Sequence, residues 1–369
     1  MECSEKPILA ENTRQELQKL HINLPDERVR SRILQNWDAV AKPIDGLGKL
    51  EKLIAQIGAV TGSVQPQFSR KAVLILCADN GIVEEQISQS GQEVTARVAK
   101  AMGQKSSSVG KMAALAGADT IPVDIGIADQ TPIQGVLARK VRCGTRNFRK
   151  EPAMTEEEAV KAIAVGIELT GKCREQGYQL LATGEMGIGN TTTSSAVAAA
   201  LLKCPVQDVT GRGAGLDDER LERKKQIIEE AVRNYDLYHA DALTILRCVG
   251  GLDIAGLTGV CIGAALFQMP VVLDGVISLT AALLAERLFP GTKQSLLPSH
   301  LGKEPAAGLL LQELGMSAVL DAGLALGEGT GAVMLFPLLD MAMSVYREGT
   351  DFAGMKLEPY RRYDDQKSS

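Results

Sequence analysis

Hydrophobic and polar positions divide the chain into two kinds of segment. Up to about residue 60, apolar residues such as Trp37, Leu50 and Ile57 recur near helical spacing, which predicts helices. From residue 71 the pattern changes to short continuous apolar runs, which are typical of buried parallel strands. These runs lie at 72–77, 121–125, 179–183 and 271–273. Strands that alternate with helical stretches predict an α/β fold with a mostly parallel sheet.

Polar residues at the starts of the helical stretches indicate where helices begin. Thr155 and Glu158 have the spacing of a capping box, and Asp217 has the position of an N-cap residue. From Asp321 onward the chain is again helical until a polar tail at 361–369. We therefore expect two domains: a large α/β domain over 65–320, and a smaller helical domain. The smaller one is built from 1–64 together with 321–369, and it contributes the loop that contains Glu328.

Composition excludes several classes of protein. The 369 residues are 45% hydrophobic and 23% charged, which is ordinary for a globular protein. The net charge of −5 does not favour binding to the phosphates of a nucleic acid, so no nucleic-acid partner is expected. The polar N-terminus is not typical of a signal peptide, and charges such as Asp253 and Asp274 interrupt the most apolar region, so no membrane partner is expected. Seven cysteines without a Cys-x-x-Cys pair favour reduced thiols in a cytoplasmic protein.

Three glycine-rich loops carry the candidate chemistry. They span 183–193, 210–215 and 326–332, and each comes directly before a predicted helix. Free backbone N–H groups at such a helix start receive anions, so a phosphate is the natural ligand. A single loop of this kind is more often only a turn. Three in one chain favour ligand binding, and two of them hold a glutamate next to glycine, Glu185 and Glu328. Exposed, solvated glutamates are the simpler alternative.

Several common cofactor motifs do not occur in the sequence. The chain has no G-x-x-x-x-G-K-[ST] phosphate loop, and the run at 187–192 lacks the third glycine of a dinucleotide fingerprint. The three histidines, at 21, 239 and 300, are too scattered for a metal triad. We therefore expect no metal and no cofactor.

Motifs along nearly the whole chain resemble the nicotinate-nucleotide–dimethylbenzimidazole phosphoribosyltransferase family, which makes the lower-ligand nucleotide of cobalamin. The resemblance is carried by strings at 42–51, 77–81, 144–147, 184–192, 211–216, 299–305 and 327–332. The strings GEMGIGNTT and LGEGTGA are long and specific. The resemblance implies a Rossmann-like α/β domain, a smaller helical domain from both termini, and a homodimer.

The same resemblance implies roles for individual residues. Glu328 matches the catalytic base and Glu185 the second active-site carboxylate. The phosphoribosyl group is expected against Gly187, Ile188, Gly189, Asn190, Thr191, Thr192, Gly213 and Lys224. The base is expected against Ser90, Val98, Leu326 and Gly327. Val98 stands where a glutamine can line the base pocket, and Gly302 where a hydroxyl residue is expected.

The implied reaction fits these residues. Nicotinate leaves nicotinate mononucleotide as a neutral pyridine, so no general acid is needed, and one carboxylate suffices to take the N–H proton of the incoming benzimidazole. A second carboxylate can steady the ribosyl centre or orient the azole. Three alternatives remain: a glycoside hydrolase that uses both glutamates, a non-catalytic homologous subunit, and a homologous phosphoribosyltransferase for another benzimidazole, adenine or a phenolic base.

Overall fold

The computed structural model describes residues 8–362, and its centre is a six-stranded sheet. The strands are β1 (Lys71–Ala78), β2 (Ala118–Gly126), β3 (Leu137–Ala138), β4 (Leu180–Met186), β5 (Val271–Leu273) and β6 (Leu296–Pro298). Their order is β3-β2-β1-β4-β5-β6, and every neighbouring pair is parallel. The α/β fold with a Rossmann-like parallel sheet is therefore confirmed. In this order the connections change direction between β1 and β4, where ligands bind in open α/β sheets.

Helices cover both faces of the sheet because the strand residues alternate between them. Leu74 and Leu76 of β1 pack with α6 (Glu156–Glu175), α11 (Leu252–Leu266) and α12 (Val276–Leu288). Val73 and Ile75 face the other core, with α4 (Glu93–Gly103), α5 (Ser108–Leu115) and the first half of α14 (Thr330–Glu348). All eight residues of β1 are buried, which explains its continuous apolar run.

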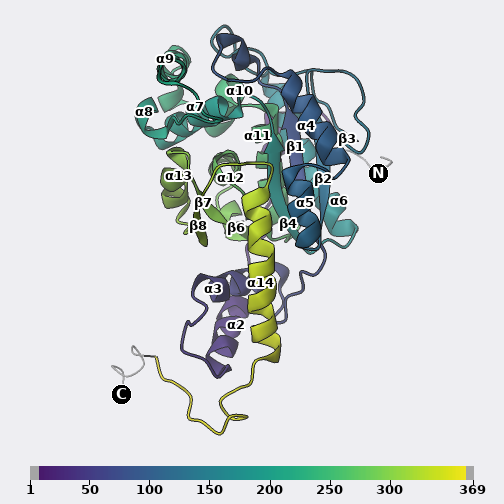
Figure 1. Cartoon of the computed structure of the whole chain (residues 1–369), viewed down its shortest axis with the longest axis vertical. Coiled ribbons are helices and arrows are strands. Elements are labelled where there is room, and N and C mark those ends of the chain that lie inside the picture. Colours follow the sequence, from purple (N-terminus) through teal and green to yellow (C-terminus); the bar gives the residue numbers. More distant parts are fainter. Residues whose placement is uncertain (1–7, 363–369) are drawn as a thin grey trace.

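The remaining elements complete the body around the sheet (Figure 1). They are the helices α7 (Asn190–Leu202), α8 (Val206–Val209), α9 (Asp218–Asn234), α10 (Ala242–Val249) and α13 (Ala306–Leu314), and the short 3₁₀ helices η1 (Gly81–Glu85), η2 (Leu237–His239) and η3 (Thr292–Ser295). The strands β7 (His300–Gly302) and β8 (Leu320–Leu324) form a separate parallel pair. The capping box of Thr155 with Glu158 and the N-cap of Asp217 are confirmed.

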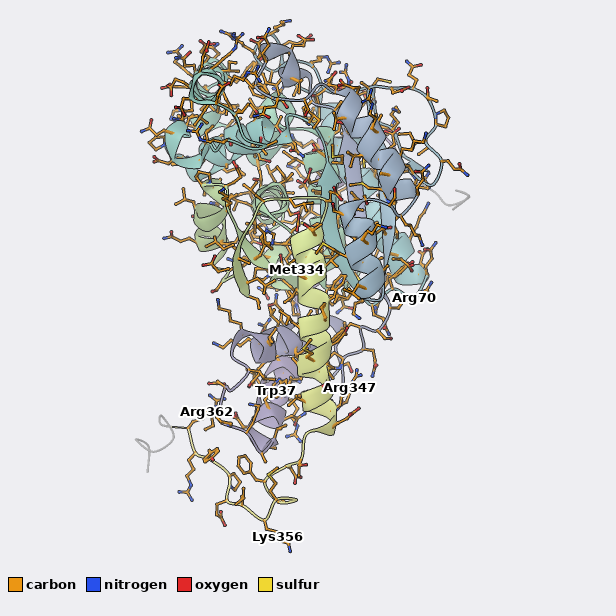
Figure 2. The ribbon with its side chains drawn as sticks, viewed as in Figure 1. Trp37, Arg70, Met334, Arg347, Lys356 and Arg362 are labelled. Atoms are coloured by element: carbon orange, nitrogen blue, oxygen red, sulfur yellow. The ribbon has the colours of Figure 1, made fainter. Side chains whose placement is uncertain are left out.

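A smaller group of helices lies beyond one end of the sheet (Figure 1). It comprises α2 (Glu27–Ala39), α3 (Lys49–Thr61) and the second half of α14. Trp37 of α2, labelled in Figure 2, packs against Tyr346 of α14 with ring centroids 5.0 Å apart and the ring planes tilted by 55°. The first helix, α1 (Arg14–Gln18), instead packs on α6, where Arg14 pairs with Glu156 at 2.8 Å.

The division into domains at 64/65 and 320/321 stays a prediction, and residues 1–7 and most of the polar tail at 361–369 lie outside the described part. The same holds for Cys3. The six cysteines that the structure describes are free, and four of them are buried. Within residues 8–362, no helix combines the length and the apolar character needed to cross a membrane.

Candidate active site

A cavity of about 320 Å³ lies at the carboxyl edge of the sheet, where β4 and β5 end and the helices α7, α12 and α14 begin. This volume is within the range of small-molecule sites. The cavity brings together ten of the residues that the sequence singled out: Val98, Glu185, Gly187, Ile188, Asn190, Thr191, Gly213, Leu326, Gly327 and Glu328. Residues of all three glycine loops thus line one space, and both glutamates lie in it.

Glu185 is the next-to-last residue of β4 and lies on the floor of the cavity. Its carboxylate accepts hydrogen bonds from the side-chain amide of Asn190 and from the backbone N–H of Glu328. Burial, followed by the nearby acids Asp253 and Asp274, raises the pKa of Glu185 to about 8. The carboxyl group is therefore mostly protonated at neutral pH.

Glu328 reaches the cavity from the loop before α14. Its backbone has a φ of +62°, and the flanking Gly327 and Gly329 also have positive φ values of +80° and +92°. Glycine takes this conformation at little cost, whereas for glutamate it is uncommon. One carboxylate oxygen of Glu328 accepts from the backbone N–H of Val109, in the first turn of α5, at 3.0 Å. The side chain is thereby aimed at a defined place in the cavity.

Asp274 was not predicted from the sequence as a site residue, yet it lines the cavity and holds the Glu328 loop. Its two carboxylate oxygens accept from the backbone N–H groups of Gly329 at 3.2 Å and of Ala332 at 3.1 Å. Burial raises the pKa of Asp274, while the nearby His300, which also lines the cavity, opposes this rise. The available signal was position: Asp274 follows buried β5 directly, so it lies at the same edge as Glu185.

Lys224 is placed beneath the cavity rather than in it. The side chain is fully buried, and its ammonium group donates to Thr191 Oγ1 at 3.1 Å and to the carbonyl oxygen of Gly211 at 3.0 Å. Burial lowers the pKa of Lys224 to about 8, although the nearby charge of Glu304 acts in the opposite direction. Lys224 therefore supports Thr191, which does line the cavity.

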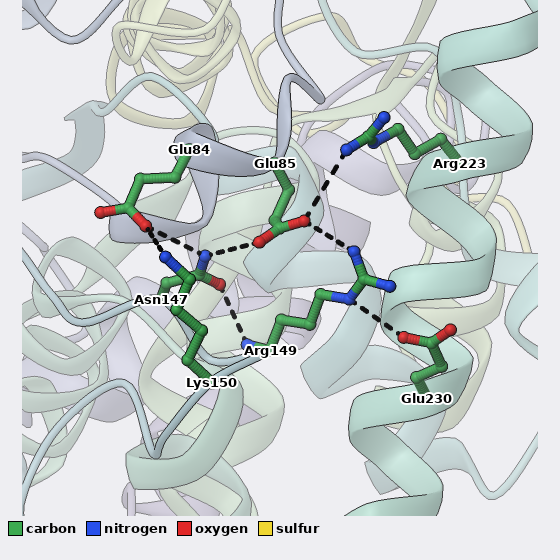
Figure 3. A network of polar contacts seen from close by, with 7 residues as sticks. All are labelled: Glu84, Glu85, Asn147, Arg149, Lys150, Arg223 and Glu230. Atoms are coloured by element: carbon green, nitrogen blue, oxygen red, sulfur yellow. Dashed lines mark hydrogen bonds and ion pairs between the residues drawn. The ribbon is translucent and has the colours of Figure 1, made fainter.

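A network of charged side chains fixes the helix that carries Lys224 (Figure 3). The buried Glu85 accepts from Arg149 at 2.8 Å and from Asn147 at 2.8 Å, and Arg149 also pairs with Glu230 of α9 at 3.1 Å. Arg223, also on α9, lies 3.9 Å from Glu85. The network ties α9 to η1 and to the loop at 147–150.

Three further predicted site residues do not line the cavity: Ser90, Gly189 and Thr192. Gly189 has a φ of +92° as the N-cap of α7, and a Cβ there would come within 2.8 Å of Val83. Thr192 is fully buried in the first turn of α7. Gly213 does line the cavity, but its N–H donates to Glu304 at 3.0 Å.

The start of α12 offers backbone donors that the sequence analysis missed. Gly275, Val276, Ile277 and Ser278 all line the cavity, and no side chain caps this helix. Ser278 is 1% exposed, and its hydroxyl has no hydrogen-bond partner among the described residues. Lys303 faces the same space. An uncapped helix start beside a lysine is suited to bind an anion. In residues 8–362, no group of three or more His, Cys, Asp or Glu side chains could hold a metal ion.

Comparison with known proteins places this geometry in a family. A family model described as "Phosphoribosyltransferase" matches residues 22–356. The nicotinate-nucleotide–dimethylbenzimidazole phosphoribosyltransferase of Clostridium acetobutylicum is 42% identical over 340 residues, which cover 92% of this chain and 97% of that protein. The enzyme of the same name from Acetivibrio thermocellus is 43% identical over 332 residues, or 89% and 94% of the two chains.

Solved structures agree. The crystal structure of CobT from Thermus thermophilus is 36% identical in sequence and superposes with a TM-score of 0.86, covering 90% of this chain and 100% of that one. A second structure from the same organism, named as the dimethylbenzimidazole phosphoribosyltransferase, gives a TM-score of 0.84 with 35% identity, and it covers 90% and 99% of the two chains. The chain belongs to the nicotinate-nucleotide–dimethylbenzimidazole phosphoribosyltransferase family.

Proposed function

We propose that this protein transfers the 5-phosphoribosyl group from nicotinate mononucleotide to 5,6-dimethylbenzimidazole or a related base, giving nicotinate and the α-riboside 5′-phosphate. The observation that carries the proposal is the meeting of Glu185 and Glu328 in one cavity at the carboxyl edge of the sheet. Relatives at 42% and 43% identity have names that state the same reaction.

The two glutamates differ in a way that suits the reaction. Glu328 is aimed into the cavity by the N–H of Val109, and it is the group that takes the N–H proton of the azole while the other nitrogen attacks C1′. Glu185, whose pKa burial raises to about 8, is mostly protonated at neutral pH, so we assign it the second role, which is to orient the azole or steady the ribosyl centre. Attack on the face opposite nicotinate inverts the β-nucleotide to an α-product.

The phosphate of the nucleotide has a matching place at the start of α12, which lines the same cavity. The free N–H groups at the start of α12, the unpartnered hydroxyl of Ser278 and the ammonium of Lys303 supply donors and positive charge. Gly187, Ile188, Asn190 and Thr191 line the same cavity and complete the phosphoribosyl site. The base end is lined by Val98 and Leu326, which are apolar.

We also propose that the enzyme works as a homodimer in the cytoplasm. An apolar stripe at helical spacing runs along α14: it comprises the exposed Met334, Met341 and Val345 and the half-buried Leu338, and Met341 is 61% exposed. Figure 2 labels Met334 at the start of this stripe. An apolar stripe of this kind is typical of a covered surface, and six free cysteines suit a reducing compartment. Light scattering on the purified protein tests the assembly: Met341→Glu is expected to yield monomers, and a monomeric unaltered protein would contradict the proposal.

The decisive test of the activity is incubation of the protein with nicotinate mononucleotide and a panel of bases, with products identified by mass. We expect nicotinate release that depends on an added azole, together with an α-riboside phosphate. Release without an azole would identify a hydrolase, and no release with any base would contradict the proposed reaction. The base consumed fastest identifies the lower ligand that the enzyme serves, whether a benzimidazole, adenine or a phenol.

A further inference from the structure

Behind Glu185, on the side away from the cavity, lies a carboxylate that neither the fold nor the reaction described above uses. Asp253, the second residue of α11, is 0% exposed. One of its oxygens accepts from the backbone N–H of Ile254 at 3.0 Å, and the other accepts from Asn190 Nδ2 at 3.1 Å. Two glycines leave room for the carboxylate of Asp253. A Cβ on Gly187 would come within 2.7 Å of one of its oxygens, and a Cβ on Gly251 would come still closer to the other.

Asn190 connects this carboxylate to the active site. Its single amide nitrogen donates one hydrogen to Asp253 and the other to Glu185. Both hydrogens of the amide are therefore used, and Asn190 cannot give either to the substrate. Asn190 is 7% exposed and begins α7, so its backbone is fixed by that helix.

The connection continues from Glu185 to Glu328. Glu185 accepts from the backbone N–H of Glu328, whose loop is in the left-handed conformation. One continuous series of hydrogen bonds thus runs from Asp253 through Asn190 and Glu185 to the backbone of Glu328. The series joins β4 and α7, which follow one another in the sequence, to two distant segments, α11 and the loop before α14.

We propose that Asp253 and Asn190 are positioning residues for the reaction, which hold the carboxyl group of Glu185 and, through it, the loop of Glu328 in the geometry needed for transfer. This rests on the proposed function. Asp253 does not line the cavity, so its hydrogen bonds reach Glu185 only through Asn190, whereas its charge acts on Glu185 through space. A buried carboxylate is costly unless it is hydrogen-bonded, and an apolar side chain at this position would avoid that cost. The arrangement therefore has a use other than stability.

The charges that act on the pKa of Glu185 are those of acids, while Glu328, His300, Lys303 and Glu304 line the same cavity. Asp253 faces it from α11 and Asp274 from the end of β5, the thiol of Cys77 lies on the neighbouring strand β1, and Asp79 faces Asp253 from the loop after β1. Removing the charge of Asp253 therefore removes a group that opposes ionisation of Glu185. The pH profile of kcat should shift because the pKa of Glu185 is lowered. If Asp253 had a purely structural role, the profile would not shift.

The test uses nicotinate mononucleotide and 5,6-dimethylbenzimidazole with four variants: Asp253→Asn, Asp253→Ala, Asn190→Ala and the double variant Asn190→Ala/Asp253→Ala. Asp253→Asn keeps an oxygen that can accept from Asn190 but loses the charge. We expect it to keep most of kcat and to shift the profile to lower pH. Asp253→Ala loses the acceptor, and we expect kcat to fall about 10²-fold with little change in either KM, the scale of a small misplacement of a catalytic group.

The double variant and a control separate positioning from general damage. If Asp253 acts through Asn190, the double variant loses no more than Asn190→Ala alone, because the two residues act as one unit. The control is Asp124→Asn, a buried aspartate within β2 that accepts from Ile127 N and pairs with Lys140 at 3.0 Å. Its melting temperature should fall without a shift of the pH profile.

Three results would overturn the inference while the proposed reaction stands: unchanged kcat in Asp253→Ala, losses that multiply in the double variant, or Asp253→Asn as impaired as Asp253→Ala with no shift of the profile. Absence of transfer by the unaltered protein would instead contradict the proposed function. Melting temperatures of all variants identify any that fail to fold. If Asp253→Ala or the double variant does not fold, the kcat and the pH profile of Asp253→Asn decide whether the inference holds.

Discussion

Lys224 allows a prediction whose magnitude follows from its burial. Its pKa is about 8 in the folded chain, whereas a free lysine has 10.5. Between these two values the unfolded chain binds a proton that the folded chain does not, and each pH unit is worth about 1.4 kcal/mol. The free energy of unfolding is therefore reduced by about 3 kcal/mol at pH 7, and this reduction shrinks as the pH rises from 8 to 10.5.

The perturbation is Lys224→Met, which keeps the length of the side chain and removes the charge. We expect the unaltered protein to gain about 2–3 kcal/mol of stability relative to this variant between pH 7 and pH 10. The variant lacks the hydrogen bonds to Thr191 and Gly211 at both pH values. Their contribution therefore cancels when the difference in free energy of unfolding at pH 7 is compared with the difference at pH 10. Urea unfolding at each pH, followed by the fluorescence of the single tryptophan, Trp37, measures the difference.

Lys225→Met is the matched control, because the side chain of this neighbouring lysine is 28% exposed. Its effect on the free energy of unfolding should be nearly the same at pH 7 and pH 10. If Lys224→Met also shows no dependence on pH, then Lys224 is charged in the folded chain without a desolvation cost, and our account of its burial is wrong.

Three further predictions concern the glutamates and the base. Glu328→Gln should lower kcat by about 10²–10⁴-fold while nicotinate mononucleotide still binds by calorimetry; near-normal turnover would rule out Glu328 as the base. Val98→Gln should sharpen the preference among equimolar bases, because a buried amide must be paired; an unchanged preference would remove residue 98 from the base pocket. The raised pKa of Glu185, about 8 against a usual 4.5, is linked to stability that is full below pH 4.5 and lost as the pH rises through 8. The melting temperature of Glu185→Gln should therefore exceed that of the unaltered protein by more at pH 9 than at pH 5, and a constant gap would contradict the raised pKa.

The sequence was sufficient for the core of the sheet and for the placement of the two glutamates. Runs such as 72–77 are buried on both faces, so their composition alone indicates a strand. The strands β3, β6, β7 and β8, of two to five residues, were not predicted, and β8 corrects the expectation that the chain is helical from Asp321 onward. Of the three-residue strands, only β5 was predicted, because its run is uniformly apolar. The glycines next to Glu185 and Glu328 indicated segments in which the backbone can approach a ligand closely, and this predicted that both glutamates lie at a binding site.

The sequence could not show which donors the fold itself would use. The sequence alone suggests that three residues bind phosphate, namely Asn190, Gly213 and Lys224. In the structure each donates to a partner within the protein: Asn190 to Glu185, Gly213 to Glu304, and Lys224 to the carbonyl oxygen of Gly211. These partners are 5, 91 and 13 residues away along the chain. Only the folded structure decides between a ligand and an internal partner, since both satisfy the same donor.

The helix α14 also has a consequence for how this enzyme can diverge. Its first turn follows Glu328, and its last turns pack on α2 and α3 at the far end of the molecule. At 19 residues it is about 28 Å long, and it is one continuous element despite Pro337 in its interior. The loop that holds Glu328 and the helix that closes the smaller group thus form one continuous segment. A substitution that changes how the end of α14 packs on α2 and α3 is therefore expected to act on the position of Glu328 as well, so the two ends of the helix are expected to change together.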